Sequence, residues 1–184
     1  MKVLIVGGGP VGLAAALALR ECDVTRDITV LEAAPRGQPV FSDRNIALSA
    51  ASWRFLKRIG IVVPDGQRAP IVEVEVSQRG AFGLLRLDAG ELDAPMLGAA
   101  SPYPALKIAF DDAANAAGVG ILYNARAVAL RHEGAHAVVR LDSGESLRAD
   151  CVVLADGAGS DLLPDFRRIE RDSGQLAVIT RVHA

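Results

Sequence analysis

The sequence predicts an α/β fold, in which a parallel sheet with helices is combined with a β-meander and part of an inserted antiparallel sheet. Two observations predict it. At 2–31, an apolar run, a glycine-rich turn, a helical pattern and a second apolar run follow one another in the order of a β-α-β unit. At 71–87 the pattern changes to alternation of apolar and polar residues around a glycine-containing turn, which is typical of an antiparallel hairpin.

The opening unit consists of two strands and the helix between them. Lys2–Val6 is a short apolar run, as expected for a strand buried on both faces of a parallel sheet. Pro10–Arg20 is expected to be helical, because a proline in the first turn loses no intrahelical hydrogen bond. After a polar turn, Ile28–Leu31 is the second strand. A second helix is predicted over Ser49–Ile59, with Ser49 as its N-cap and the following glycine as its stop.

The remaining pattern predicts one more helix and several strands. The helix begins near Pro104 and ends at Gly118. Strands are expected at Val119–Tyr123, Ala125–His132, Ala135–Leu141, Ala149–Leu154 and Leu176–Val182. We therefore assign 1–70 and 101–184 to a nucleotide-binding domain and 71–100 to the inserted sheet.

Composition and charge limit the classes of function. The chain has 184 residues, 51% of them hydrophobic, and a formal net charge of −2. This balance gives no electrostatic basis for a nucleic-acid partner or an anionic membrane surface. Cys22 and Cys151 fit no CxxC spacing, so we expect a reducing compartment, the cytoplasm, with Cys151 as a small buried hydrophobe.

The glycine turn carries the clearest functional signal. Gly7, Gly9 and Gly12 form a GxGxxG pattern between the first strand and helix, where the glycines permit a tight turn, a close approach of a pyrophosphate and close helix packing. Glu32 ends the second strand twenty residues after Gly12, where a carboxylate accepts hydrogen bonds from the adenosine ribose. The pattern predicts an ADP-containing ligand and leaves NAD and FAD open.

Two further segments bear on that choice. Asp43 and Arg44 are expected just before the second helix, where a guanidinium can pair with a pyrophosphate, although a surface arginine beside an aspartate fits equally well. The strand ending at Leu154 leads to Asp156 and Gly157, which presents a carboxylate at the carboxyl end of a strand, where open α/β sheets bind ligands.

Together these segments resemble one family. GxGxxG, VLEA containing Glu32, DRNIALS from Asp43 to Ser49, VSQRGAFGLLRLDAGE and ADGAGS are similar to segments of the FAD-dependent aromatic hydroxylases, the group A flavoprotein monooxygenases. Within that group the chain most resembles the ubiquinone-biosynthesis 2-polyprenylphenol hydroxylases. The resemblance implies a Rossmann-like FAD-binding domain, an inserted substrate-domain sheet, FAD as cofactor, NAD(P)H as reductant and hydroxylation of a phenol ring with O2.

The resemblance also implies roles for individual residues. Gly7, Gly9 and Gly12 would face the ADP pyrophosphate, Glu32 would bind the adenosine ribose, Arg44 would contact the FAD pyrophosphate, and the Val128 backbone would touch adenine. Asp156, with Gly157, would serve both FAD and the approach of NAD(P)H. The cofactor-binding residues predicted in this way are Gly7, Gly9, Pro10, Val11, Gly12, Glu32, Arg44, Val128, Asp156 and Gly157. No catalytic residue and no metal ligand is assigned.

The sequence also bears on other classes of function. The chain has no GxSxG and no GxxxxGK[ST], which removes the main hydrolase and nucleoside-triphosphatase classes. His132 and His136 fall in a predicted hairpin and are expected to be solvated. The family that the chain resembles has a later Gly-Asp motif that binds the ribityl and pyrophosphate groups, and no Gly-Asp dipeptide occurs in this sequence. The resemblance therefore implies the N-terminal half of an enzyme, inactive alone. The alternative is a non-catalytic nucleotide-binding half acting with a partner chain.

The partners follow from the same resemblance. We expect an aromatic small molecule as substrate and no nucleic acid. A lipid-like phenol would bring the protein to a membrane surface peripherally. Association with the missing C-terminal half, or with further copies of the chain, is also expected.

Overall fold

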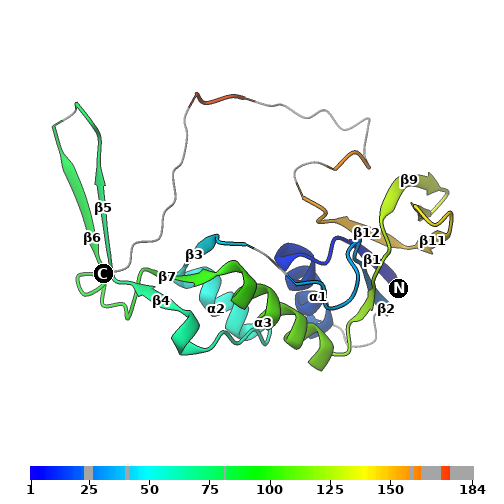
Figure 1. Cartoon of the computed structure of the whole chain (residues 1–184), viewed down its shortest axis with the longest axis horizontal. Coiled ribbons are helices and arrows are strands. Elements are labelled where there is room, and N and C mark those ends of the chain that lie inside the picture. The colour runs from blue at the N-terminus through cyan, green and yellow to red at the C-terminus, as the bar shows by residue number, and fades with distance from the viewer. Residues whose placement is uncertain (23–26, 40–41, 81, 158–159, 163–170, 175–184) are drawn as a thin grey trace.

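The computed structural model describes residues 1–22, 27–39, 42–80, 82–157, 160–162 and 171–174. Four strands form a parallel sheet, which Figure 1 shows toward the end of the molecule where the N-terminus lies. The strand order is β12 (Cys151–Leu154), β1 (Lys2–Val6), β2 (Asp27–Leu31) and β8 (Gly120–Leu122). All three pairings are parallel, so the carboxyl ends of β1, β2 and β12 meet at one edge of the sheet.

Three helices accompany this sheet. They are α1 (Pro10–Cys22), α2 (Ala50–Arg58) and α3 (Tyr103–Ala116). The predicted Ser49 N-cap of α2 is confirmed, since its side chain accepts a hydrogen bond from the backbone N–H of Ser52 at 3.2 Å. In the described part of the chain, no helix is both long and apolar enough to cross a membrane.

A β-meander covers the other side of the parallel sheet. It consists of β9 (Ala127–Glu133), β10 (His136–Leu141) and β11 (Ser146–Ala149), paired antiparallel in the order β11-β10-β9. Figure 1 shows β9 and β11 on the side of β1 and β2 that lies away from the helices. The meander confirms the predicted hairpin on either side of Glu133 and Gly134.

Side chains of β1 alternate between two cores because successive residues of a strand point to opposite faces. Val3 and Ile5 pack into the core that includes α1, α2 and α3. Leu4 and Val6 pack into a second core that includes the meander. Each of the four is at most 4% exposed, which explains why the first strand is apolar at every position after Lys2.

A second sheet extends the molecule beyond α2. Its strands are β3 (Asn45–Ser49), β7 (Gly98–Pro102) and β4 (Ala69–Ile71), in the order β3-β7-β4, with a short 3-10 turn, Asp65–Gln67, before β4. Helix α2 is joined to this sheet by Trp53, whose indole N–H donates to the carbonyl of Ala99 at 3.0 Å.

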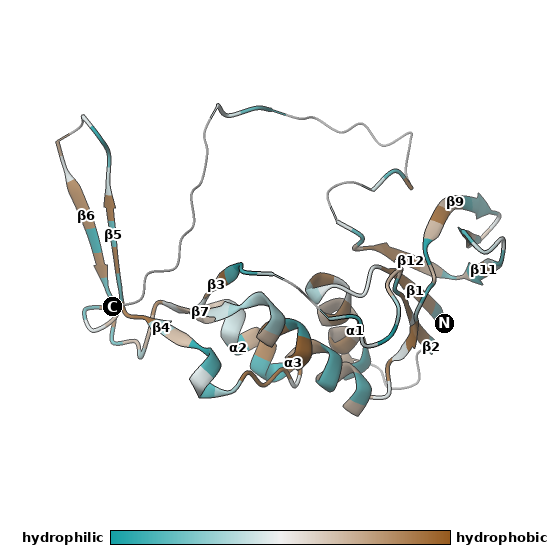
Figure 2. Ribbon diagram, in the orientation of Figure 1, coloured by the Kyte–Doolittle hydropathy of each residue, from teal (hydrophilic) through white to brown (hydrophobic). Residues whose placement is uncertain are grey.

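The predicted hairpin is present as β5 (Glu73–Ser77) and β6 (Leu84–Asp88). Figure 1 shows it projecting away from the remaining elements. Val74 pairs with Leu87 and Val76 pairs with Leu85, so these four apolar side chains share one face. Figure 2 shows hydrophobic colouring along both strands. Val76, Leu85 and Leu87 are 53%, 55% and 41% exposed, so the described residues leave this face largely open to solvent.

The α/β fold with a parallel sheet, a meander and a separate antiparallel hairpin confirms the predicted fold class. Three local predictions were wrong. A strand, β3, precedes α2, so Asp43 and Arg44 do not lie just before a helix. The expected strand at 149–154 is two strands separated at Asp150. Cys151 is exposed, because no described strand covers that edge of the sheet. The strand expected at 176–182 lies outside the described residues.

Asp150 marks the break between β11 and β12 and ties the meander to the N-terminus. Its Oδ2 accepts a hydrogen bond from the Lys2 backbone N–H at 2.8 Å, and its Oδ1 lies 3.0 Å from Nδ1 of His136. The Lys2 N–H, followed by His136, lowers the pKa of the Asp150 carboxyl below its ordinary value of 3.8.

This depressed pKa predicts an acid-dependent loss of stability. The Asp150 contribution is present above the ordinary value of 3.8 and is lost as pH falls through the lower pKa of the folded state. Asp150→Asn is therefore expected to be less stable than the unsubstituted chain at pH 7, and the difference should shrink below about pH 4. Urea unfolding at several pH values measures this. Asp112→Asn, an exposed carboxylate on α3, is the control. A difference that does not change with pH would contradict the assignment.

Candidate dinucleotide-binding site

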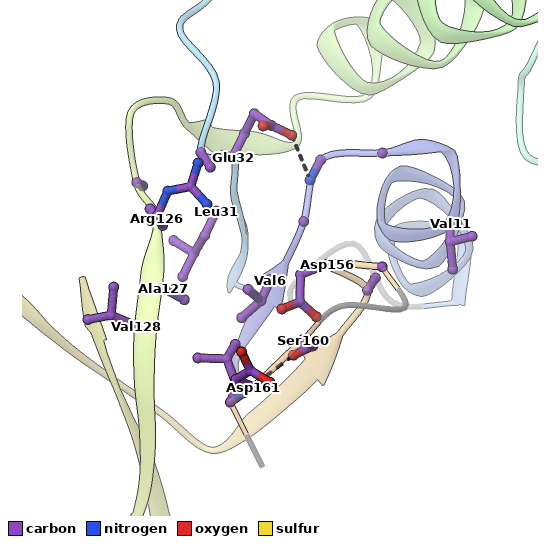
Figure 3. Close-up of a pocket in the computed structure, with 18 of the residues that line it drawn as sticks. Val6, Val11, Leu31, Glu32, Arg126, Ala127, Val128, Asp156, Ser160 and Asp161 are labelled. Carbon is purple, nitrogen blue, oxygen red and sulfur yellow. Dashed lines mark hydrogen bonds between the residues drawn. The ribbon is translucent and has the colours of Figure 1, made fainter. Parts of the chain in front are cut away.

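A groove of about 670 Å³ lies where the carboxyl ends of β1, β2 and β12 meet. Each strand leads directly into its wall: Val6 into the glycine turn, Leu31 into Glu32, and Leu154 into Ala155 and Asp156 (Figure 3). The lining residues are Val6, Gly7, Gly8, Gly9, Pro10, Val11, Leu31, Glu32, Ala33, Ala125, Arg126, Ala127, Val128, Ala155, Asp156, Gly157, Ser160, Asp161 and Leu162.

The start of the glycine turn is held against the ends of β2 and β12. The Gly7 N–H donates to the Leu31 carbonyl at 2.8 Å, and Gly7 has a φ of +103°, in the region that favours glycine. A Cβ at Gly7 would lie 2.4 Å from the Ala155 carbonyl oxygen, and one at Gly8 would lie 2.5 Å from Oε2 of Glu32. Gly7 is therefore required by the protein itself, before any ligand is considered, whereas a side chain at Gly8 would displace the Glu32 carboxylate.

Gly9 and Gly12 differ in what surrounds them. A Cβ at Gly12 would lie 1.9 Å from the Gly7 carbonyl oxygen, so this glycine allows α1 to pack against the turn and faces the protein, outside the groove lining. A Cβ at Gly9 would have no atom within 4 Å. The protein leaves space at Gly9, and the first N–H groups of α1 beside it have no intrahelical acceptor, as at helix N-termini that bind phosphate.

Glu32 is fixed at the end of β2 by two backbone donors. Its Oε2 accepts from the Gly8 N–H at 2.9 Å, which Figure 3 shows as a dashed line, and its Oε1 accepts from the Ala34 N–H at 2.8 Å. A carboxylate can accept about four hydrogen bonds, so each oxygen still has a free lone pair for a hydroxyl group. Glu32 is thus placed beside the glycine turn and oriented before a ligand binds.

The third wall follows β12. The Ala155 N–H donates to the Val6 carbonyl at 2.8 Å, which carries the chain past the end of β1 and places Asp156 and Gly157 in the groove lining. Ser160 and Asp161 also line it. Sequence reasoning missed these last two, because nothing in the pattern after Gly157 marks them as part of the groove.

The fourth wall is the beginning of β9. Val128, 44% exposed, lines the groove together with Arg126 and Ala127. Arg126 was not predicted. Its alternation with Val128, two residues later, is the signal that could have found it, because residues two apart in an extended segment share a side.

Eight of the ten predicted residues line this one groove: Gly7, Gly9, Pro10, Val11, Glu32, Val128, Asp156 and Gly157. Gly12 lies behind the turn. Arg44 is not in the lining, since its guanidinium lies 5.1 Å from the centre of the Tyr103 ring and its Nε donates to Ser42 Oγ at 3.3 Å.

The groove suits the ADP part of a dinucleotide. It combines an uncovered glycine at a helix N-terminus, which suits phosphate, with an oriented carboxylate, which suits ribose hydroxyls. Within the described residues no cluster of three or more histidine, cysteine or acidic side chains is arranged to hold a metal ion. His132 and His136 lie in the β9–β10 hairpin, and His136 is paired with Asp150.

A parallel sheet with a glycine turn, a carboxylate at the end of the second strand and an aspartate at the end of a third is typical of α/β dinucleotide-binding domains. The comparison with known families then gives a definite assignment. The sequence model of the family described as "FAD binding domain" matches residues 1–168, and the chain belongs to this family. The resemblance that the sequence motifs indicated is confirmed at this level, and FAD is the ligand that the family predicts for the groove.

Solved structures share the same fold. The tetrameric form of 2-methyl-3-hydroxypyridine-5-carboxylic acid oxygenase is 25% identical, with a TM-score of 0.68 over 88% of this chain and 40% of that chain. The peptidyl tryptophan dihydroxylase QhpG is 23% identical, with a TM-score of 0.60 over 87% and 33%. CtdE, solved in complex with FAD, is 19% identical, with a TM-score of 0.62 over 87% and 39%. The chain therefore spans about 40% of the length of the first of these proteins.

Glu32→Ala is expected to weaken ADP and FAD binding by roughly 1–3 kcal/mol, because ribose hydroxyls lose their acceptor. The variant should also be less stable without ligand, since the N–H groups of Gly8 and Ala34 lose theirs. Calorimetric titration with ADP and FAD, with riboflavin as a ligand that lacks adenosine, measures the first effect. The ADP affinity of Glu32→Gln, which keeps one acceptor oxygen, should fall between those of the unsubstituted protein and Glu32→Ala. Unchanged ADP affinity in Glu32→Ala would place the ribose elsewhere.

Proposed function

We propose that this chain is the FAD-binding portion of a monooxygenase that hydroxylates an aromatic substrate, using NAD(P)H and O2. The observation that carries the proposal is the groove in which Gly9, Glu32 and Asp156 meet. Support comes from the FAD binding domain family and from structural neighbours whose names describe an oxygenase and a dihydroxylase. The motifs DRNIALS and ADGAGS favour an aromatic hydroxylase over a plain NAD-dependent enzyme.

In this proposal the residues of the chain bind and orient the cofactor. FAD, when bound, supplies the redox and oxygen chemistry. The first N–H groups of α1 and the open space at Gly9 receive the pyrophosphate, and Glu32 accepts hydrogen bonds from the adenosine ribose. Asp156, at the end of β12, faces the groove beyond the turn and serves both FAD and the approach of NAD(P)H. Arg44 is proposed to reach the pyrophosphate through a change in its side-chain conformation, since it now packs on Tyr103.

The substrate is proposed to be a polyprenyl phenol of the ubiquinone-pathway type. The support is the resemblance of the motif segments and the hairpin β5–β6, which we assign with the rest of 71–100 to a substrate-binding sheet. Its face formed by Val74, Val76, Leu85 and Leu87 is apolar, as the wall of a site for a prenylated ring must be. Such a lipid-like substrate would bring the protein to a membrane surface without a spanning helix. The other face carries Glu73, Glu75 and Arg86.

We also propose the cytoplasm as its compartment, because both cysteines, Cys22 and Cys151, are free and exposed. The apolar hairpin face is proposed to be covered by the remainder of a longer enzyme or by another copy of the chain. These 184 residues alone are proposed to oxidise NAD(P)H without hydroxylating the phenol, because the groove that they form is open to water.

The experiment measures FAD binding first and chemistry second. Titration with FAD and with FMN should show binding of FAD only, since FMN lacks the adenosine that Glu32 recognises. Mixtures with FAD, NADPH, O2 and a prenylated phenol are then assayed for hydroxylated product and for hydrogen peroxide. We expect peroxide from the 184 residues and product from a longer protein that contains them. FAD binding with neither product nor NADPH oxidation in the longer protein would favour the non-catalytic alternative.

A further inference from the structure

Among the described residues that line the groove, Arg126 is the only one with a positively charged side chain. The other charged lining residues are Glu32, Asp156 and Asp161. Ion pairs and side-chain hydrogen bonds are found for other arginines, whereas the Arg126 guanidinium makes none with the described residues. A cation that has no partner among the described residues therefore lies in a groove that is suited to a negatively charged dinucleotide.

The backbone of Arg126 is held in place on both sides. Its carbonyl accepts a hydrogen bond from the Asp142 N–H at 2.9 Å, which joins it to the end of the meander. The preceding residue, Ala125, is buried, and its N–H donates to the Glu32 carbonyl at 2.9 Å. The start of the Arg126 side chain is thus fixed relative to Glu32, while its guanidinium is exposed.

The position of Arg126 indicates which part of the ligand it meets. The glycine turn marks the phosphates and Glu32 marks the ribose, so the base must lie beyond Glu32, on the side away from α1. Figure 3 shows Arg126 beside Leu31 on the Glu32 side of the groove, with Val11 of α1 on the opposite side. Arg126 and Val128 line this end together.

We propose that the Arg126 guanidinium stacks on the adenine ring of the bound dinucleotide and is a binding determinant for the adenosine end. This inference rests on the proposed function, because it requires an adenine-containing ligand. A guanidinium is planar, weakly hydrated and suited to stacking on an aromatic face.

Stacking and phosphate pairing make different predictions for two substitutions. Stacking requires a flat group, so Arg126→Phe should keep FAD and ADP affinity within about threefold, while Arg126→Ala should lose about five- to tenfold for both ligands. Pairing with a phosphate requires the charge, so both variants would lose affinity equally and the loss would shrink at high salt. Arg131→Ala, at an exposed arginine of β9 outside the groove lining, is the matched control and should bind normally.

The experiment is calorimetric titration of the four proteins with FAD and with ADP, at low and at high salt, after circular dichroism has shown that each variant is folded. We expect the order unsubstituted, Arg131→Ala, Arg126→Phe and then Arg126→Ala, with little effect of salt. Equal losses of affinity in both Arg126 variants, or no loss in Arg126→Ala, would overturn the stacking assignment but not the proposed function. Absence of FAD and ADP binding in the unsubstituted protein would instead overturn the proposed function on which it rests.

Discussion

Gly12→Ala is expected to destabilise the protein by at least about 2 kcal/mol, although the substitution replaces glycine by the best helix former. In an exposed helix interior, alanine stabilises by about 1 kcal/mol relative to glycine. Here the added Cβ would lie 1.9 Å from the Gly7 carbonyl oxygen and 3.3 Å from a methyl group of Ile5. Because the nearest atom is backbone, it cannot rotate away, and α1 must move off the turn.

Chemical denaturation of Gly12→Ala without ligand measures this effect, and the midpoint should fall without a change in the slope. Gly66→Ala is a matched control, because its added Cβ would have no atom within 4 Å and its stability should stay within about 0.5 kcal/mol of the unsubstituted protein. A Gly12→Ala protein at least as stable as the unsubstituted one would show that α1 does not pack on the glycine turn as described.

The sequence was sufficient for the part of the fold whose pattern is local. Lys2–Val6 is apolar at nearly every position because it is buried between two cores, and Gly12 is required by its contacts with Gly7 and Ile5 a few residues earlier. The Gly-x-Gly-x-x-Gly pattern and Glu32 lie at the spacing typical of a dinucleotide-binding β-α-β unit. For this reason the position of Glu32 beside the glycine turn could be predicted without coordinates.

The sequence was insufficient where structure depends on distant partners. The strands β3 and β7 have weak β patterns, NIALS and GAASP, and are strands because they pair with each other across about fifty residues of chain. Without that pairing, Asn45–Ser49 was interpreted as the approach to a helix. The break at Asp150 has the same origin, because it depends on the hydrogen bond of the carboxylate to the N-terminal strand.

In the site, too, residues marked by a local sequence pattern could be predicted, whereas a residue placed by contacts far along the chain could not. Glu32 and Asp156 end apolar strands, so their place at the groove follows from the strand pattern. Arg126 does not end an apolar strand, and its place at the groove depends on long-range hydrogen bonds, such as that between the Asp142 N–H and the Arg126 carbonyl. Arg44 illustrates the reverse case, since a family motif assigns it to the pyrophosphate while its side chain here packs on Tyr103.

Gly9→Asp is expected to abolish FAD and ADP binding while leaving the fold as stable as before or slightly more so. Gly9 directly precedes α1, and its carbonyl accepts the first helical hydrogen bond, from Leu13 at 3.0 Å. Aspartate is among the preferred residues at this position, and its charge favours a helix N-terminus, so about 0.5 kcal/mol of added stability is expected. The added Cβ would meet no protein atom within 4 Å.

The same carboxylate would occupy the place where phosphate binds. Two like charges about 4 Å apart near a protein surface repel by about 4 kcal/mol, so affinity for ADP should fall at least about 100-fold. Thermal unfolding with and without FAD measures both effects together, since only bound ligand raises the midpoint. Gly9→Asn, of nearly equal size but neutral, separates exclusion by volume from repulsion by charge and should retain more affinity than Gly9→Asp. A Gly9→Asp protein that FAD stabilises as much as the unsubstituted chain would show that the pyrophosphate does not lie at this turn.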